Sequence, residues 1–370
     1  MTEVLLKELS NSDIDWMIAS GRQEEITAGS VLIEPGRPID AFYIVLDGTL
    51  TVAVPQAESD PLALAFSALE GRETTEREIA RLSSGEMVGQ VCLLSAQPPH
   101  TIVKALENTL VLSIPSQQLA KKLQQDITFA AHFYRVLATL LSARLRHIVT
   151  QLGHRRFAQD SPLREVLLVF GELSDSDIDW MIVTGCSVKI PADTVLIRAE
   201  RPVEGLYILL NGIMKVFVSD EDYNPLTLAF AALGDGETES RDREIGKLFP
   251  GDIIGEMPFV DDYPPATTVR AIEDSLVLMI PRQELTVKLQ QDVVFASHFY
   301  RVMAILLSDR VRQIAAKVGY GRRVYSAEQA LDETIEYEDE LEPNILDRVS
   351  LAGARFDWML RRLRVKAISN

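Results

Sequence analysis

Residues 9–54 read LSNSDIDWMIASGRQEEITAGSVLIEPGRPIDAFYIVLDGTLTVAV, and residues 173–218 read LSDSDIDWMIVTGCSVKIPADTVLIRAERPVEGLYILLNGIMKVFV, the same pattern 164 positions later. The match resumes further along the chain, in 61–69 with 225–233 and in 123–148 with 289–314. A period of this length exceeds the about 20–50 residues of a solenoid unit and has the size of a whole domain. The sequence therefore predicts two copies of one module, followed by a unique tail.

The composition is that of an ordinary globular protein, with 47% hydrophobic and 25% charged residues in a chain of 370. It contains no run of 18 apolar residues, and its opening MTEVLLKELSNSD lacks the basic and apolar regions of a secretory signal. Neither Cys92 nor Cys186 is repeated, because they align with Pro258 and Arg22. A disulfide framework is therefore not expected, and we expect a cytoplasmic protein without stable membrane insertion.

The net charge of −17 opposes nonspecific binding to nucleic acid and to anionic membranes. Part of the charge lies in LDETIEYEDELEP, residues 331–343, where a solvated linker is favoured over a dedicated interaction tail. The segment after residue 318 is too acidic and too weakly periodic for a helix-turn-helix. The sequence therefore predicts no nucleic-acid partner.

Each copy begins with a short helix signal and continues as a series of short β-rich runs. The N-cap candidates before IDWMI are Ser12 or Asp13 in the first copy and Ser176 or Asp177 in the second. The β-rich runs are separated by Gly, Pro and Asp turns, such as Leu-Asp-Gly at 46–48. Many short strands with this punctuation are typical of an antiparallel roll or barrel.

Each copy ends in an amphipathic helix of about six turns. Apolar residues recur there at three- and four-residue steps, from Ile127 to Leu152 in the first copy and from Ala296 to Val318 in the second. Basic residues gather toward the end of the first helix, namely Arg144, Arg146, Arg155 and Arg156. A favourable interaction with the helix C-terminus explains them as well as nucleic acid would.

The order of these blocks resembles the cyclic-nucleotide-binding domain. The first copy carries VLIEPGRPIDAFYIVLDGTLTV, the turn SGEMVGQ, VKALENTLVLSIP and a long helix, and the second carries PGDIIGEMPFV and VRAIEDSLVLMIP in the same order. The resemblance covers residues 1–152 and 165–318. It implies a mainly β, α+β fold of two tandem jelly-roll-type β-rolls of eight strands, each ending in a long helix.

The predicted domain organisation has five parts. They are domain 1 at 1–152, a linker at 153–164, domain 2 at 165–318, an acidic linker at 319–343 and a helical tail at 344–370. The whole chain also resembles a group of tandem-domain cyanobacterial proteins associated with bacteriocin-type peptide export. The phrases VSLAGARFDWMLRRL (349–363) and SDIDWMI (12–18) carry that second resemblance.

The family resemblance implies a phosphate-binding cassette with the approximate pattern F-G-E, a short helix with L-L, then P-R-x-A-T-V. In the family, the helix amides and the Arg hold the cyclic phosphate, and the Glu accepts a hydrogen bond from the ribose hydroxyl. The candidate pocket positions are Gly255, Glu256, Met257, Thr267 and Thr268 in the second copy, and Gly89, Gln90, Val91 and Thr101 in the first.

Both copies depart from the family pattern at the phosphate arginine, which is replaced by Pro99 and Pro265. A hydrogen bond to a charged group contributes about 1.5–3 kcal/mol. Its loss therefore predicts about 10- to 150-fold weaker binding. No cofactor is certain, and cAMP or cGMP is the candidate ligand. Lys104 and Arg270, five residues downstream of the prolines, could reach inward and replace the arginine or, by strand alternation, point to solvent. His100 is a weaker candidate for this replacement, in the first copy alone.

Two further features suggest contacts to other elements or proteins. The insertions at 55–78 and 219–244 both carry the apolar block PL[AT]LAF[SA]AL, which predicts either added core or a protein-contact surface. All three tryptophans, Trp16, Trp180 and Trp358, lie in the phrase Asp-Trp-Met. We therefore expect a tail helix at about 344–366 to dock on a roll as the N-terminal helices do, with Arg361, Arg362, Arg364 and Lys366 giving it a basic face.

These features predict a non-enzymatic regulatory or adaptor protein. The two long helices would form an intramolecular pseudo-dimer of the domains, with homo-oligomers left open, and a transporter or regulator would be the protein partner. The alternative is a genuine cAMP or cGMP receptor that uses Glu256. No catalytic residue or metal site is predicted, because the five histidines form no repeated ligand set; His132 and His298 recur in HFYRV, where packing or capping is expected.

Overall fold

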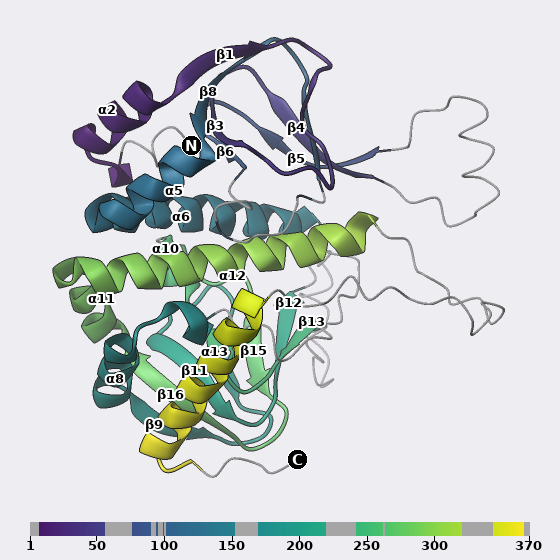
Figure 1. Ribbon diagram of the computed structural model, residues 1–370. Helices are drawn as coiled ribbons and strands as arrows, with labels where there is room; N and C mark the ends of the chain where they lie inside the picture. The colour runs from purple at the N-terminus through teal and green to yellow at the C-terminus, as the bar shows by residue number, and fades with distance from the viewer. Residues whose placement is uncertain are drawn as a thin grey trace, which may run out of the picture. The chain divides into compact units, whose positions relative to one another are not determined.

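The computed structural model describes residues 7–55, 76–89, 94, 99, 101–151, 169–219, 242–261, 263–319 and 343–365. The chain divides into two compact units, which are drawn in Figure 1. Unit 1 comprises Met1–Arg144 and Ala304–Ser350, and unit 2 comprises Leu145–Met303 and Leu351–Asn370.

In the described residues, unit 1 contains a short helix, a β-roll and two further helices of the first copy, together with part of residues 304–350 from later in the chain. The elements are α2 (Asn11–Ser20), β1 (Arg22–Ile26), β2 (Val31–Ile33), β3 (Ala41–Asp47), β4 (Leu50–Pro55), β5 (Glu76–Leu82), β6 (Met87–Val88), β7 (Ile102–Ala105), β8 (Thr109–Pro115), α5 (Ser116–Gln125) and α6 (Ile127–Gln151), of which the last continues into unit 2. The strands form two antiparallel four-stranded sheets in the orders β1-β8-β3-β6 and β2-β7-β4-β5.

Unit 2 repeats this plan. The elements are α8 (Asp175–Thr184), β9 (Cys186–Ile190), β10 (Val195–Ile197), β11 (Gly205–Asn211), β12 (Met214–Ser219), β13 (Asp242–Leu248), β14 (Ile253–Ile254), α10 (Met257–Val260), β15 (Thr268–Ala271), β16 (Ser275–Pro281), α11 (Arg282–Gln291), α12 (Val293–Gly319), which continues into unit 1, and α13 (Pro343–Arg362), which belongs to unit 2 from Leu351 on. Its sheets have the orders β9-β16-β11-β14 and β10-β15-β12-β13.

The predicted fold class is confirmed. Both rolls show the same pairing, and even the irregularities coincide, since the register shifts at Val45/Asp47 in unit 1 and at Leu209/Asn211 in unit 2. The insertions connect paired strand ends, Pro55 with Glu76 and Ser219 with Asp242. Their central residues, 56–75 and 220–241, lie outside the described residues, as do most of both predicted linkers.

Alternating apolar residues fill each roll because successive side chains of a strand point to opposite faces. On β7, for example, Val103 and Ala105 are each 2% exposed and belong to the core, whereas Lys104 between them does not. The tight turn at the predicted Leu-Asp-Gly site (46–48) requires glycine, as does the matching turn at Gly212. Gly48 has a φ of 89°, and a Cβ there would lie 2.7 Å from the Thr109 Oγ1.

The N-caps of α2 and α8 are Ser10 and Ser174, so the predicted caps at Ser12 or Asp13 and at Ser176 or Asp177 were wrong by two or three residues. Each aspartate is instead the third residue of its helix, where it completes a capping box. The Asp13 carboxylate accepts a hydrogen bond from the Ser10 N–H at 2.9 Å, and the Asp13 N–H donates to the Ser10 Oγ at 3.2 Å.

In each copy, a histidine of the long helix contacts the aspartate of the capping box. The His132 Nδ1 lies 2.8 Å from the Asp13 Oδ2, and the His298 Nδ1 lies 2.7 Å from the Asp177 Oδ2. The arginine of the HFYRV phrase pairs one turn further on, Arg135 with Glu8 and Arg301 with Glu172. The recurring phrase therefore fastens the last helix of each copy to its first helix.

The Asp-Trp-Met phrase of the two N-terminal helices forms a repeated stack. The Trp16 ring lies edge-on to Phe129 with a centroid distance of 5.1 Å, and the Lys122 ammonium lies 5.6 Å from the Trp16 centroid. Trp180, Phe295 and Lys288 repeat the arrangement at 5.0 and 5.6 Å. Burial of the neighbouring methionine, 3% exposed for Met17, completes the contact of the helix with its roll.

The part of α13 that belongs to unit 2 docks beside α8 (Figure 1, yellow). The Arg355 guanidinium donates to the Asp175 carboxylate at 2.8 Å and to the Phe170 carbonyl at 3.0 Å. The Phe356 and Phe170 ring centroids are 5.2 Å apart, and Met359 is fully buried. Among the helices that the structure describes, none combines the length and the apolar character that a membrane crossing requires.

Candidate functional site

The turn after β14 is the start of the candidate site in unit 2, here called cassette 2 (residues 254–269). Gly255 has a φ of 81°, in the region that favours glycine. A Cβ at this position would lie 3.0 Å from the Val203 Cγ1 and 3.1 Å from the Gly205 carbonyl oxygen. In the matching cassette 1 (residues 88–103), Gly89 has a φ of 94°, and its Cβ would lie 3.0 Å from the Ala41 carbonyl oxygen. Both glycines are therefore required by the backbone.

Glu256 directly precedes the short helix α10 and is 4% exposed. Its carbonyl accepts a hydrogen bond from the Phe259 N–H at 3.0 Å, and the Met257 carbonyl accepts one from the Asp261 N–H at 3.0 Å. Pro258, in the first turn, has no N–H to offer a ligand. The cassette 1 counterparts Gln90 and Val91 lie outside the described residues.

Both prolines at the family's arginine position are buried and hold a backbone contact. The Pro265 carbonyl accepts a hydrogen bond from the Glu200 N–H at 2.8 Å, and the Pro99 carbonyl accepts one from the Gly36 N–H at 2.9 Å. The donors lie in equivalent turns and share a left-handed backbone, with φ of 59° at Glu200 and 74° at Gly36. This position therefore has a structural role in both copies and supplies no positive charge.

The threonines of cassette 2 lie on the segment that leads into β15. Thr268 is 8% exposed, and its hydroxyl accepts a hydrogen bond from the Ala199 N–H at 3.2 Å. Thr267 and, in cassette 1, Thr101 are half-buried. The Thr268 hydroxyl therefore already has a hydrogen bond to the protein backbone. His100, the weaker candidate of the first copy, lies outside the described residues.

The two downstream cations do not point into the rolls. Val269 and Ala271 belong to the core of unit 2, so Arg270 between them lies on the opposite face of β15. There its guanidinium lies 5.4 Å from the centroid of Phe217. Lys104 has the same place between Val103 and Ala105 in unit 1. Neither side chain replaces the missing arginine from the interior of its roll.

Basic residues of α6 pair with acidic residues inside each unit. In unit 2, the Arg146 Nη2 lies 2.5 Å from the Asp261 Oδ2, and the guanidinium carbon lies 4.3 Å from the centroid of Tyr263. In unit 1, the Arg144 Nη2 lies 4.0 Å from a Glu86 carboxylate oxygen, and burial lowers the pKa of the Arg144 guanidinium. The predicted cluster of basic residues is thus explained in part by internal ion pairs, which sequence alone did not indicate.

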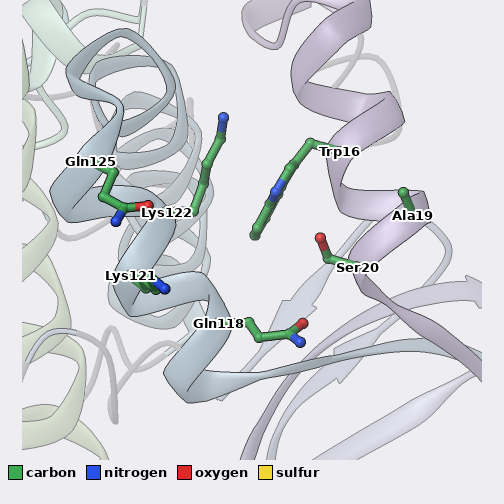
Figure 2. A pocket seen from close by; sticks show the side chains of 7 residues that line it. All are labelled: Trp16, Ala19, Ser20, Gln118, Lys121, Lys122 and Gln125. Carbon is green, nitrogen blue, oxygen red and sulfur yellow. The ribbon is translucent and has the colours of Figure 1, made fainter.

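A groove between α2 and α5 in unit 1 was not anticipated from the sequence. Figure 2 shows the Trp16 ring and the Lys122 side chain projecting toward the space between the two helices. The cavity measures about 410 Å³ and is lined by Trp16, Ala19, Ser20, Gln118, Lys121, Lys122 and Gln125. The Lys122 ammonium is 2.7 Å from the Asp126 carboxylate, so its charge is already compensated.

Metal-ligating side chains do not gather anywhere in the described part of the chain. Within those ranges, no group of three or more His, Cys, Asp or Glu residues is placed to hold an ion. The histidines His132 and His298 are instead committed to single aspartates. The described site offers backbone turns, a buried carboxylate and hydroxyl groups.

The family model described as "Cyclic nucleotide-binding domain" matches residues 23–126 and 187–292, which together make up more than half of the chain. The two matches cover both rolls and both cassettes. They start at the first strand of each roll and end where the long helix begins.

Among curated proteins, the chain is 25% identical over 205 residues to patatin-like phospholipase domain-containing protein 6 of Mus musculus, covering 54% of this chain and 11% of that protein. It is 23% identical over 205 residues to protein 7 of the same series from Rattus norvegicus, covering 55% and 11%. The matched segment therefore spans about a tenth of the length of these relatives.

Among solved structures, the chain is similar to the regulatory domain of Toxoplasma gondii PKA crystallised with cAMP, with 16% identity, coverage of 79% of this chain and 89% of that chain, and a TM-score of 0.26. It is also similar to the Thermus thermophilus catabolite activator protein, with 19% identity, coverage of 50% and 75%, and a TM-score of 0.32.

Proposed function

Because the chain belongs to the cyclic nucleotide-binding domain family, we propose that it is a non-enzymatic regulatory protein whose two nucleotide cassettes have lost most of their affinity and which acts through a protein partner. The family membership covers both copies and supports a regulatory role. The weakened cassettes and the partner are the parts that this proposal adds.

The observation that carries the proposal is the pair of buried prolines at the phosphate-arginine position. The carbonyl groups of Pro99 and Pro265 are held by the turns at Gly36 and Glu200, so the cassette loop is fixed around a residue without charge or N–H. The lost charge-assisted hydrogen bond corresponds to about 1.5–3 kcal/mol, or about 10- to 150-fold in affinity. Arg270 and Lys104 lie on the outer faces of their strands and do not offset the loss.

Cassette 2 retains more of the family pattern than cassette 1. It keeps Gly255 and a buried Glu256, whereas the first copy has Gln90 in place of the glutamate. We assign the remaining nucleotide contacts to two segments of cassette 2. They are Gly255, Glu256 and Met257 around the start of α10, and Thr267 and Thr268 around the start of β15. A carboxylate near a phosphate is unfavourable, and the loss of the family's arginine removes the cation that binds this phosphate in the family. Both effects lower the proposed affinity for cAMP or cGMP.

The partner in this proposal is a transporter or its regulator, in a bacteriocin-type peptide export system. The support is the resemblance of the tail phrase 349–363 and of SDIDWMI to proteins associated with such export. The tail helix itself is held on unit 2 by ion pairs of its arginines with Asp175 and Asp179. The intramolecular pseudo-dimer of the two domains stays a prediction.

A second candidate function is a genuine receptor gated by cAMP or cGMP. The observation that favours it is Glu256, which matches the family's ribose contact and is 4% exposed at the start of α10. This reading needs the helix amides and Glu256 to hold the ligand without the arginine.

Calorimetric titration of the full chain with cAMP, and then with cGMP, separates the two functions. Weakened cassettes predict a dissociation constant in the high micromolar range or weaker, or no heat at millimolar ligand. Micromolar binding that is lost on Glu256→Ala would refute the proposal and identify a receptor. Gln90→Ala, at the matching position of the first copy, is the control that tests whether cassette 1 contributes.

A further inference from the structure

The tail helix binds two acidic residues on one face of α8, Asp175 and Asp179. Asp175, Ile178, Asp179 and Ile182 follow each other at three- and four-residue steps and therefore share one helix face. Within this stripe of residues, Asp175 is bound by Arg355 at 2.8 Å and Asp179 by Arg362 at 3.6 Å. Between them Ile178 is fully buried.

Unit 1 carries the same stripe in a more exposed state. The corresponding residues of α2 are Asn11, Ile14, Asp15 and Ile18, here called the α2 stripe. Ile18 is 58% exposed, Asp15 is exposed, and Ile14 is half-buried where Ile178 is fully buried. In unit 2 both acidic positions beside this face are bound by a helix. That precedent, rather than the exposure alone, marks the face of α2 as a contact surface.

Two substitutions indicate that the chain's own tail is not the occupant of the α2 stripe. Arg355 binds the Asp175 carboxylate and the carbonyls of Phe170 and Gly171. In unit 1, Asn11 stands in place of Asp175 and the exposed Lys7 in place of Gly171. A basic side chain at the position of Arg355 therefore loses the carboxylate that it binds in unit 2, and it meets a lysine side chain where unit 2 has a glycine. The second half of the stripe is unchanged, because Asp15 matches Asp179.

We infer that the α2 stripe is the docking surface for an amphipathic helix of a partner protein, one with apolar residues facing Ile14 and Ile18, a basic residue facing Asp15 and a neutral residue facing Asn11. This inference rests on the proposed adaptor function and names the surface that serves it. The tail helix on unit 2 is the internal precedent for its geometry, since it is an amphipathic helix held by the same two kinds of contact.

The test uses a defined probe, a fluorescein-labelled peptide of residues 343–366 that carries Arg355→Gln to suit Asn11. Fluorescence anisotropy with the full chain is expected to show saturable one-to-one binding. Ile18→Asp is expected to weaken it about 10- to 100-fold, because burial of one aliphatic side chain is lost. Asp15→Lys is expected to weaken it by up to about 5-fold, the range for an exposed ion pair. Both positions are exposed, so neither substitution threatens the fold.

Matched variants decide where the peptide binds. Val183→Asp places the same charge on a 79% exposed position of α8 and is expected to leave the affinity unchanged. Asn11→Asp is expected to restore preference for the unsubstituted peptide, with Arg355 present, by recreating the acid of unit 2. The inference is overturned by an absence of saturable binding at millimolar peptide, or by binding that Ile18→Asp leaves intact. Neither result alters the outcome of the nucleotide titration, so the two proposals fail separately.

Discussion

Replacing Asp177 with alanine is the sharpest test of how each copy holds its helices together. This carboxylate accepts hydrogen bonds from the Ser174 N–H at 2.8 Å and from the Ser174 hydroxyl at 2.7 Å, and it lies 2.7 Å from the His298 Nδ1. Loss of a helix cap costs about 1 kcal/mol. Loss of a hydrogen bond to a charged group costs about 1.5–3 kcal/mol. We therefore expect Asp177→Ala to lower the free energy of unfolding of unit 2 by about 2–4 kcal/mol, since such terms do not add fully.

The same contact makes stability depend on pH. Burial raises the pKa of the Asp177 carboxyl, but hydrogen bonds from His298 and Ser174 outweigh it and hold the pKa below its ordinary value of 3.8. A carboxyl with a depressed folded-state pKa contributes stability above its unfolded pKa, and that stability is lost as the pH falls through the folded value. The difference between wild type and Asp177→Ala should therefore be full at neutral pH and shrink below about pH 4.

Urea denaturation can isolate this effect in unit 2. In a background with Trp16→Phe and Trp358→Phe, the tryptophan fluorescence comes from Trp180 alone. Trp180 packs on Phe295 of α12, the helix that also carries His298, with ring centroids 5.0 Å apart. Asp15→Ala, an exposed acid of the equivalent helix, is the control and should shift the midpoint little. A loss below about 0.5 kcal/mol for Asp177→Ala, the range of ordinary surface substitutions, or a loss that persists unchanged at low pH, would refute the reasoning.

Three further predictions concern the turns and the tail. Gly36→Ala should destabilise unit 1 by about 1–2 kcal/mol in thermal melting through backbone strain alone, because φ is 74° and no atom lies within 4 Å of the added Cβ. Glu200→Gly, in the matching turn, should be neutral or stabilising, and a destabilised protein would contradict the assignment of the strain to the left-handed backbone. Gly255→Ala should lower the free energy of unfolding by more than Gly36→Ala, because its Cβ also meets atoms at 3.0–3.1 Å. An equal loss would show that these neighbouring atoms move aside at no cost. Arg355→Ala should speed hydrogen exchange of residues 351–365, and unchanged exchange would mean that its contact with Asp175 does not hold the tail.

The fold was predictable because the repeat shows each structural signal twice. Apolar alternation on β7 and β15, glycine turns at Gly48 and Gly212, and the long apolar stripes agree in both copies, and all of them depend on local spacing alone. The N-caps were misplaced because several neighbouring Ser and Asp residues are equally suitable by type. Only the three-dimensional partner, His298 for Asp177, shows that the aspartate belongs inside the helix.

Only the residue types of the candidate site, and not their contacts, could be predicted from the sequence. The missing arginine can be read at Pro99 and Pro265, but their role in holding the turns at Gly36 and Glu200 depends on contacts about 65 residues apart in sequence. The side-chain direction of Arg270 needed the register of β15 to be known. The pairing of Arg146 with Asp261 joins residues 115 positions apart, and no periodicity in the sequence marks it.

The most direct test of the central claim is to restore the arginine with Pro265→Arg and to measure cAMP affinity by calorimetry beside the wild type. Pro99→Arg, in the cassette that has Gln90 in place of glutamate, is the matched control. The account predicts that Pro265→Arg tightens binding by about 10- to 150-fold, and that Pro99→Arg has the smaller effect. Tight binding by the wild type, or no gain from Pro265→Arg in a folded protein, would contradict the claim that the lost arginine disables the cassettes.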